Sequence, residues 1–150
     1  MNLKIGFCKL DDRATIPSKA HEDDLGFDLH CLEDVTISAN NSKTTPAITK
    51  VRTGVAARFP GWCGGLIRDR SGISTKNGIF IVAGVIDPQY TGEIIVAFYN
   101  STFNDVTFKA GDRIAQMLIM PVIPVEVEEI DDDMMHETTR GARGFGSTGI

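Results

Sequence analysis

Residues 78–99 read Gly-Ile-Phe-Ile-Val-Ala-Gly-Val-Ile-Asp-Pro-Gln-Tyr-Thr-Gly-Glu-Ile-Ile-Val-Ala-Phe-Tyr and hold the clearest structural pattern of the chain. Two runs rich in Ile, Val and Phe, at 78–82 and 93–99, flank a segment with Gly84, Asp87-Pro88 and Gly92. β-Branched and aromatic residues favour strands, whereas Gly, Pro and Asp favour the turns between them. The segment therefore predicts two strands joined by a tight connection.

The same pattern of short apolar runs separated by Gly, Pro, Asn and Asp continues along the rest of the chain. No window keeps an apolar period of 3.6 for more than about two turns, and only residues 71–76 suggest a short helix. Many short strands with frequent turns predict one all-β domain, built as a sandwich, jelly roll or barrel. The expected strands are 3–9, 34–38, 50–59, 62–68, 78–82, 93–99, 106–108 and 113–121.

Length and composition agree with one folded domain and exclude several classes of protein. The chain has 150 residues, of which 42% are hydrophobic and 23% charged, as in ordinary globular proteins. The longest apolar runs, such as 78–86, are far shorter than the roughly 18 residues that a membrane span needs, so no membrane partner is expected. Residues 1–6 do not resemble a secretory signal. The odd number of cysteines, Cys8, Cys31 and Cys63, favours a reducing, intracellular compartment.

The negative charge is concentrated near the C-terminus. Seven acidic residues and no Lys or Arg lie between Glu126 and Glu137, and removing them from the net charge of −5 leaves the remainder at +2. That remainder has no block of Lys and Arg, so a nucleic-acid polymer is not an expected partner. A small anion, bound by a few arginines, is still consistent with this charge distribution as a partner.

The last twenty residues, 131–150, differ from the body at 1–130. An acidic stretch is followed by Arg-Gly-Ala-Arg-Gly-Phe-Gly-Ser-Thr-Gly at 140–149. This tail cannot bury enough apolar surface to fold alone. A frayed terminus is one interpretation, and the other is a flexible arm that wraps phosphates and lays a ring on a base.

Two clusters in the first half of the chain suggest polar sites. Asp28 follows Gly26 inside an apolar stretch, so it is either a turn residue or a partly buried carboxylate that needs backbone amides, an Arg or a hydrated metal as partner. Arg70, Ser71 and Gly72 lie where a strand is expected to end and a helical turn to begin. They predict either an anion site or a simple Ser cap with a surface Arg.

Two further clusters lie in the second half. Gly84 permits close approach of the backbone to a ligand, and Asp87 sits before a proline that stiffens its turn, with Tyr90 three residues later. A carboxylate held in this way can take a proton from water, although a plain hairpin turn would use the same residues. Gln116 shares the phase of Ile114 and Leu118, which predicts an inward-facing amide bonded to backbone, water or a phosphate oxygen.

Taken together and in order, these motifs resemble those of the trimeric deoxyuridine triphosphatases (dUTPases). The motifs are Gly-Phe-Asp-Leu at 26–29, Arg-Ser-Gly at 70–72, Ala-Gly-Val-Ile-Asp-x-x-Tyr-x-Gly at 83–92, Gly-Asp-Arg-Ile-Ala-Gln at 111–116 and Arg-Gly-x-x-Gly-Phe-Gly-Ser-Thr-Gly at 140–149. The resemblance covers essentially the whole chain.

The resemblance implies a β jelly-roll (β-clip) fold assembled as a homotrimer, with an exchanged C-terminal arm that closes over a neighbour's site. It implies hydrolysis of dUTP to dUMP and pyrophosphate by attack of water on the α-phosphorus. That reaction keeps uracil out of DNA and supplies dUMP for thymidylate synthesis. Mg²⁺ would travel with the triphosphate, touched by Asp28 through water at most.

The resemblance also implies a role for each matching residue. Asp87 would be the base that activates water, and Tyr90 would pack on the deoxyribose and exclude a 2′-hydroxyl. The backbone of Gly84, Val85 and Ile86 would bind the uracil edge. The substrate phosphates would be held by Arg70, Ser71, Gly72 and Gln116. The arm would close over the substrate through Arg140, Phe145, Gly146, Ser147 and Thr148, with Phe145 stacked on uracil and Arg140 on the γ-phosphate.

Two departures and two competing functions complete the sequence interpretation. Asp69 replaces a common Pro, so its carboxylate is expected to point away from the phosphates or to pair with Arg68 or Arg70, and Leu25 replaces a usual Ala. The related dCTP deaminases use a Glu and an Arg where this chain has Ala97 and Thr75, which disfavours deamination. A nucleotide-gated regulatory protein on the same body is the other alternative.

Overall fold

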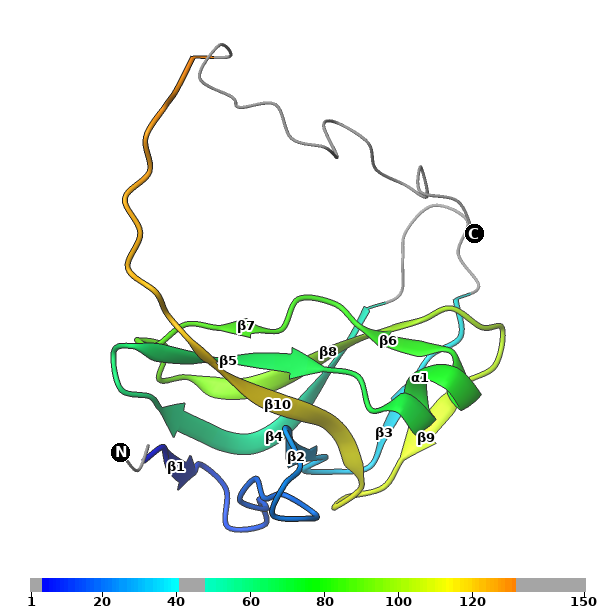
Figure 1. Cartoon of the computed structure of the whole chain (residues 1–150). Coiled ribbons are helices and arrows are strands. Elements are labelled where there is room, and N and C mark those ends of the chain that lie inside the picture. Colours follow the sequence, from blue (N-terminus) through cyan, green and yellow to red (C-terminus); the bar gives the residue numbers. More distant parts are fainter. Residues whose placement is uncertain (1–3, 41–47, 132–150) are drawn as a thin grey trace.

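Strands form almost all of the regular structure in the computed structural model, which describes residues 4–40 and 48–131 (Figure 1). In these residues the one helix, α1 (Ser71–Asn77), is too short to cross a membrane. The all-β expectation is therefore confirmed. The ten strands are β1 (Gly6–Lys9), β2 (Phe27–His30), β3 (Val35–Ile37), β4 (Ile48–Arg58), β5 (Cys63–Arg68), β6 (Ile79–Ile81), β7 (Val85–Ile86), β8 (Glu93–Asn100), β9 (Val106–Phe108) and β10 (Arg113–Pro121).

The strands form two four-stranded sheets and one small ribbon. The first sheet has the order β1-β4-β8-β6 and the second the order β2-β10-β5-β7, while β3 pairs with β9. All of these pairs are antiparallel. The sequence predicted every strand except β2 and β7, which are only four and two residues long.

The hydrophobic core lies between the two sheets. The first sheet contributes Ile94, Val96 and Phe98 from β8, and the second contributes Leu29 and Met117, all at most 1% exposed. Alternate residues of β8 face this core, whereas Ile95 on the same strand is 41% exposed. This period-two pattern is the physical basis of the strand prediction.

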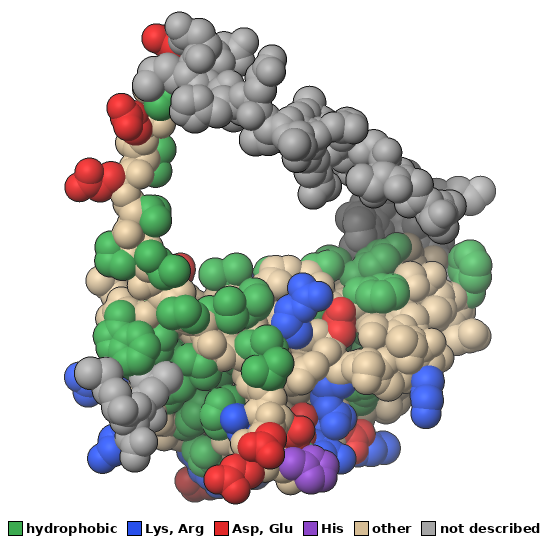
Figure 2. Space-filling model, in the orientation of Figure 1, with side chains coloured by type: hydrophobic (Ala, Val, Ile, Leu, Met, Phe, Trp, Pro, Cys, Tyr) green, Lys and Arg blue, Asp and Glu red, His purple; other side chains and the backbone are tan. Residues whose placement is uncertain are grey.

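The sheets stop at Pro121, and residues 122–131 then leave the body as an extended segment (Figure 1). It carries both hydrophobic and acidic side chains (Figure 2), and Ile123, Val125 and Val127 are 73%, 77% and 95% exposed. Among the described residues, no strand pairs with residues 123–131, so these apolar side chains are left exposed there.

Truncation of a core residue in β8 tests this arrangement. Ile94→Ala should lower the free energy of unfolding by about 2–5 kcal/mol, because it leaves a cavity between the sheets. Ile95→Ala removes the same atoms from the adjacent, partly exposed position, and should cost less than half as much. Urea unfolding followed by Trp62 fluorescence measures both, and equal losses would contradict the assigned faces of β8.

Candidate functional site

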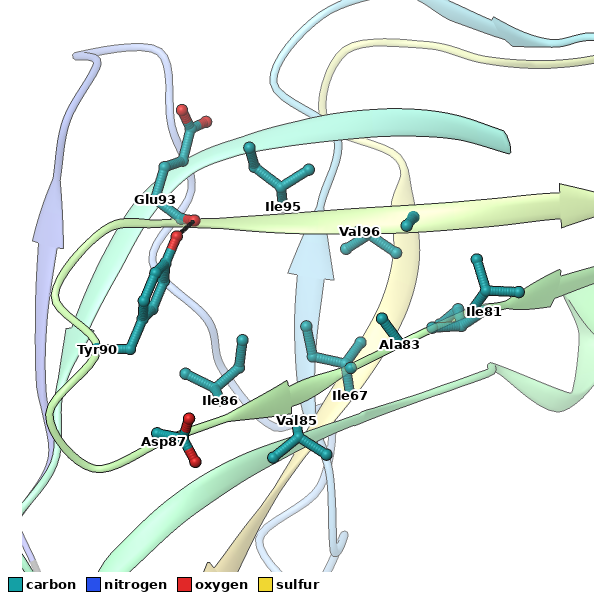
Figure 3. A pocket seen from close by; sticks show the side chains of 13 residues that line it. Ile67, Ile81, Ala83, Val85, Ile86, Asp87, Tyr90, Glu93, Ile95 and Val96 are labelled. Atoms are coloured by element: carbon teal, nitrogen blue, oxygen red, sulfur yellow. Dashed lines mark hydrogen bonds between the residues drawn. The ribbon is translucent and has the colours of Figure 1, made fainter. Parts of the chain in front are cut away.

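The residues singled out by the sequence line two cavities that share no residue. The first cavity has a volume of about 250 Å³, and its wall is formed by residues 81–87 together with Ile67, Tyr90, Glu93, Ile95, Val96 and Ala97 (Figure 3). The second has a volume of about 500 Å³ and is lined by Asp28, Arg70, Ser71, Gly72, Gln116, Ala20, Asp24, Leu25, Gly26, Ile73 and Lys76. One cavity is mainly apolar and the other is rich in charged and polar side chains.

The first cavity depends on the chain crossing from β6 in one sheet to β7 in the other. Ala83 and Gly84 make this crossover with φ of 68° and 117°. A left-handed conformation costs a non-glycine residue such as Ala83 about 1–2 kcal/mol. At Gly84 a Cβ atom would lie 2.8 Å from the carbonyl O of Ile67, so this glycine permits close packing on β5.

Asp87 and Tyr90 lie at the same end of the first cavity (Figure 3). The Tyr90 N–H donates to the Asp87 carbonyl at 3.0 Å, which closes a turn with Pro88 at its second position. The Tyr90 hydroxyl donates to the Glu93 carbonyl at 2.9 Å. A Cβ at Gly92 would lie 2.5 Å from the tyrosine hydroxyl oxygen, so only glycine leaves room for this ring. The Asp87 side chain is exposed at the cavity mouth.

In the second cavity, Asp28 is held between two arginines. Its Oδ1 lies 3.1 Å from Arg70 Nε and its Oδ2 lies 3.3 Å from Arg113 Nη1, and the Asp28 side chain is 13% exposed. Arg70 Nη1 also donates to the Arg113 carbonyl at 3.2 Å. Of the partners that the sequence left open for Asp28, the structure selects arginine. The pairing orients the Arg70 guanidinium beside Ser71 and Gly72, at the start of α1.

Gln116 lies in the second cavity and not on the core face, so its predicted inward phase with Ile114 was wrong. The register of β10 against β2 shifts between Arg113 and Ala115, which is a β-bulge. After the bulge Ala115 and Met117 face the core, and Gln116 turns to the opposite face. Gly26 accommodates it, because a Cβ at Gly26 would lie 2.5 Å from Gln116 Oε1.

Asp69 points away from the second cavity, as one of the two expectations for it required. Its Oδ1 accepts a hydrogen bond from the Ile81 N–H at 2.7 Å, and its backbone carbonyl accepts one from Gln116 Nε2 at 2.8 Å. The alternative pairing with Arg68 or Arg70 does not occur.

Lys76 is a residue of the second cavity that the sequence interpretation missed. It lies in the last turn of α1, four residues after Gly72. That spacing places two residues on the same face of a helix, and it is the pattern that could have identified Lys76. The exposed Leu25, the other departure noted in the sequence, lines the same cavity.

The predicted arm residues Arg140, Phe145, Gly146, Ser147 and Thr148 lie outside the described residues. Within the described ranges, no group of three or more His, Cys, Asp or Glu side chains could hold a metal ion.

Comparisons with known proteins give a consistent family. The family model described as dUTPase matches residues 12–149. A deoxyuridine 5′-triphosphate nucleotidohydrolase of Gloeothece citriformis is 41% identical over 150 residues, covering 99% of this chain and 98% of that protein. The protein of the same name from Paramecium bursaria Chlorella virus 1 is 39% identical over 142 residues, covering 95% of each chain.

Solved structures share the fold. The dUTPase of Staphylococcus bacteriophage 80alpha with dUPNHPP superposes with a TM-score of 0.84 at 24% identity, covering 98% of this chain and 99% of that one. A mutant dUTPase of phage phi11, described with a coordinated structural Mg(II) ion, gives a TM-score of 0.75 at 22% identity over 86% of this chain and 97% of that one.

His30, two residues after Asp28 on β2, gives a testable electrostatic property of this region. Its Nδ1 is buried and has no hydrogen-bond partner in the described residues. Burial lowers the pKa of His30 below 6.5; the Asp28 carboxylate opposes this shift, and Arg113 and Arg70 add to it. Below pH 6.5 the unfolded chain therefore binds this proton more readily than the folded chain does.

We expect the free energy of unfolding to fall between about pH 7.5 and about pH 5.5, in part through His30. His30→Gln should reduce that fall, because it removes this titrating group. Urea unfolding at the two pH values measures the slope. An equal slope in wild type and His30→Gln would contradict the assignment.

Proposed function

This chain belongs to the dUTPase family, and from that premise we propose that it hydrolyses dUTP to dUMP and pyrophosphate. One observation carries the proposal: every described residue that the resemblance assigns to the substrate lines one of the two cavities. Gly84, Val85, Ile86, Asp87 and Tyr90 line the first cavity, and Asp28, Arg70, Ser71, Gly72 and Gln116 line the second.

The first cavity is suited to the nucleoside. Its apolar side chains, among them Ile67, Ile86 and Val96, suit the faces of a flat base, and its volume of about 250 Å³ fits a nucleoside better than a whole triphosphate. The backbone of residues 84–86 would bind the polar edge of uracil. Tyr90, fixed by its bond to Glu93, would pack on the deoxyribose and leave no room for a 2′-hydroxyl.

Asp87 would act as the base for a water molecule. Its carboxylate is exposed beside Tyr90. This is the end of the cavity at which the deoxyribose of a bound nucleotide would connect to its phosphates. The water would lose its proton to Asp87 and attack the α-phosphorus, and pyrophosphate would depart with the electrons of the P–O bond. Positioning and charge neutralisation supply most of such a rate enhancement.

The second cavity is suited to the phosphates. Arg70 is oriented by Asp28 and Arg113, and Ser71, Gly72 and Gln116 add hydrogen-bonding groups. Asp28 is engaged by two arginines, which suits contact with Mg²⁺ through water rather than direct ligation. Mg²⁺ would enter as part of the substrate and neutralise phosphate charge. Arg140, Phe145, Gly146, Ser147 and Thr148 would close over the bound nucleotide.

We propose further that the chain works as a homotrimer with its sites at subunit contacts. Two observations support this proposal. The two cavities of one chain share no residue, and the extended segment 122–131 exposes apolar side chains that need a partner. In such a trimer the phosphate cavity of one copy would lie against the nucleoside cavity of its neighbour, and the arm at 131–150 of a neighbouring copy would complete the site.

Two alternatives receive less support. Ala97 lines the first cavity at the position where the related deaminases have a catalytic Glu, so the wall has a methyl group in place of that carboxylate. The regulatory alternative has no feature of the described residues in its favour. An intracellular location is proposed as well, supported by three free thiols, of which Cys31 and Cys63 are buried.

A substrate panel tests the proposed reaction. Pyrophosphate release with Mg²⁺, measured on dUTP beside dCTP, dTTP and UTP with identification of the products, should be far faster from dUTP than from the other three. Binding of dUTP without cleavage would contradict the proposal and favour a nucleotide-gated binding protein.

Replacing the proposed base should separate binding from chemistry. Asp87→Asn should lower kcat by about 10²–10⁴-fold with little change in dUTP binding, because only proton transfer is lost. Asp12→Asn, at an exposed carboxylate away from both cavities, serves as the control. Near-normal turnover of Asp87→Asn would remove Asp87 from its assigned role.

Deleting residues 140–150 should lower kcat/KM by about tenfold or more, because the arm would close the site. The melting temperature should change by only about 2–4 °C or less, since the described sheets and core are built from residues before 122. Removing only residues 149–150 is the matched control. Unfolding of the longer deletion would mean that the arm is structural.

A further inference from the structure

We infer that Asp69 is a positioning residue that shapes the nucleoside cavity from a distance, an inference that rests on the proposed function. Asp69 contacts a residue of each cavity: its carboxylate accepts from the Ile81 N–H at 2.7 Å, and its carbonyl accepts from Gln116 Nε2 at 2.8 Å. Any residue at position 69 supplies the carbonyl. Only the side chain supplies the bond to Ile81, and the proline common in the family at this position has no such acceptor.

The Ile81 N–H needs this acceptor because β6 is the outer strand of its sheet. The order β1-β4-β8-β6 leaves one edge of β6 without a strand partner. Ile81 is the last residue of β6 and is half-buried, so water can solvate its N–H only in part. A partly buried amide without an acceptor is destabilising. Asp69 satisfies it where the chain leaves the first sheet.

The crossover that follows is strained and is held at both ends. Ala83 and Gly84 have positive φ, and such conformations persist only where the surroundings fix them. On one side the Val82 N–H donates to the Ala97 carbonyl at 2.9 Å, and on the other the Ile67 N–H donates to the Gly84 carbonyl at 2.8 Å. Both are backbone bonds. Asp69 adds the side-chain bond that fixes Ile81 just before them.

The residues directly after this crossover, Val85 and Ile86, together with Gly84, are the ones proposed to bind the uracil edge. A shift of a few tenths of an ångström in that backbone weakens its hydrogen bonds to the uracil edge, because these bonds depend on direction and distance. The same shift has less effect on packing against the ring, which any base provides. Asp69 lines neither cavity, so it acts through Ile81 and not on the substrate. Losing its side chain should therefore reduce base discrimination more than phosphate binding.

The test compares kcat/KM for dUTP with kcat/KM for dCTP in wild type, Asp69→Ala, Asp69→Asn and Asp69→Glu. Asp69→Ala removes the acceptor and should reduce the dUTP preference at least about fivefold, mainly through a higher KM for dUTP. Asp69→Asn keeps an acceptor at the same place and should retain most of the preference. Asp69→Glu keeps the charge but displaces the acceptor oxygen, so it should also reduce the preference for dUTP over dCTP. This variant tests the inference even if Asp69→Ala folds poorly.

Asp105→Ala is the matched control, because Asp105 Oδ1 accepts from the Ala39 N–H at 2.7 Å and lines neither cavity. It should lower the melting temperature without changing the dUTP preference. Amide hydrogen exchange should accelerate at Ile81–Gly84 in Asp69→Ala but not in Asp105→Ala. An unchanged preference in Asp69→Ala and Asp69→Glu, with wild type still cleaving dUTP, would overturn the inference alone. Failure of wild type to cleave dUTP would instead overturn the proposed function and this inference with it.

Discussion

The chain must cross from one sheet to the other between β6 and β7 within three residues, and the first cavity depends on how it does so. Ala83 and Gly84 adopt left-handed conformations, and Gly84 packs against the β5 backbone so closely that no side chain fits. The crossover brings Ile81–Asp87 along the wall of the first cavity. Local strain is thus located at the proposed site, where surrounding bonds hold it.

The composition of the two cavities explains why one suits the nucleoside and the other suits the phosphates. The first offers apolar walls, one ring and one exposed carboxylate, which suits a neutral base and an activated water. The second offers Arg70, Lys76 and polar groups, with Asp28 already paired, which suits an anion. Asp87 lies in a different cavity from Arg70. Within the described residues, its carboxylate therefore has no arginine partner. A site assembled from two copies would bring base and phosphate groups together only when substrate binds between them.

Most of the fold could be predicted from the sequence because strands such as β8 and β10 carry long alternating or β-branched runs. The strands β2 and β7 were missed because they are short and lie among turn-forming residues: β2 contains Asp28 directly after Gly26, and β7 lies between Gly84 and Asp87. The ten described residues that the sequence singled out all line the two cavities, whereas Lys76 was missed, and the grouping into two cavities was not predicted because it depends on strand order. The face of Gln116 was wrong because a bulge after Arg113 shifts the phase, and nothing in the local sequence marks that bulge. The partner of Asp69 is twelve residues away, beyond the reach of local patterns.

The central claim, that one site is completed by two copies of the chain, is tested most directly by mixing two inactive variants. Asp87→Asn damages the nucleoside cavity, and Arg70→Ala damages the phosphate cavity. In co-expressed mixed trimers, a site that joins the intact cavities of two different chains should work, giving about a quarter of the wild-type rate of pyrophosphate release. If each chain instead held a whole site, every site would carry one of the two defects, and the mixture would stay as inactive as its parents.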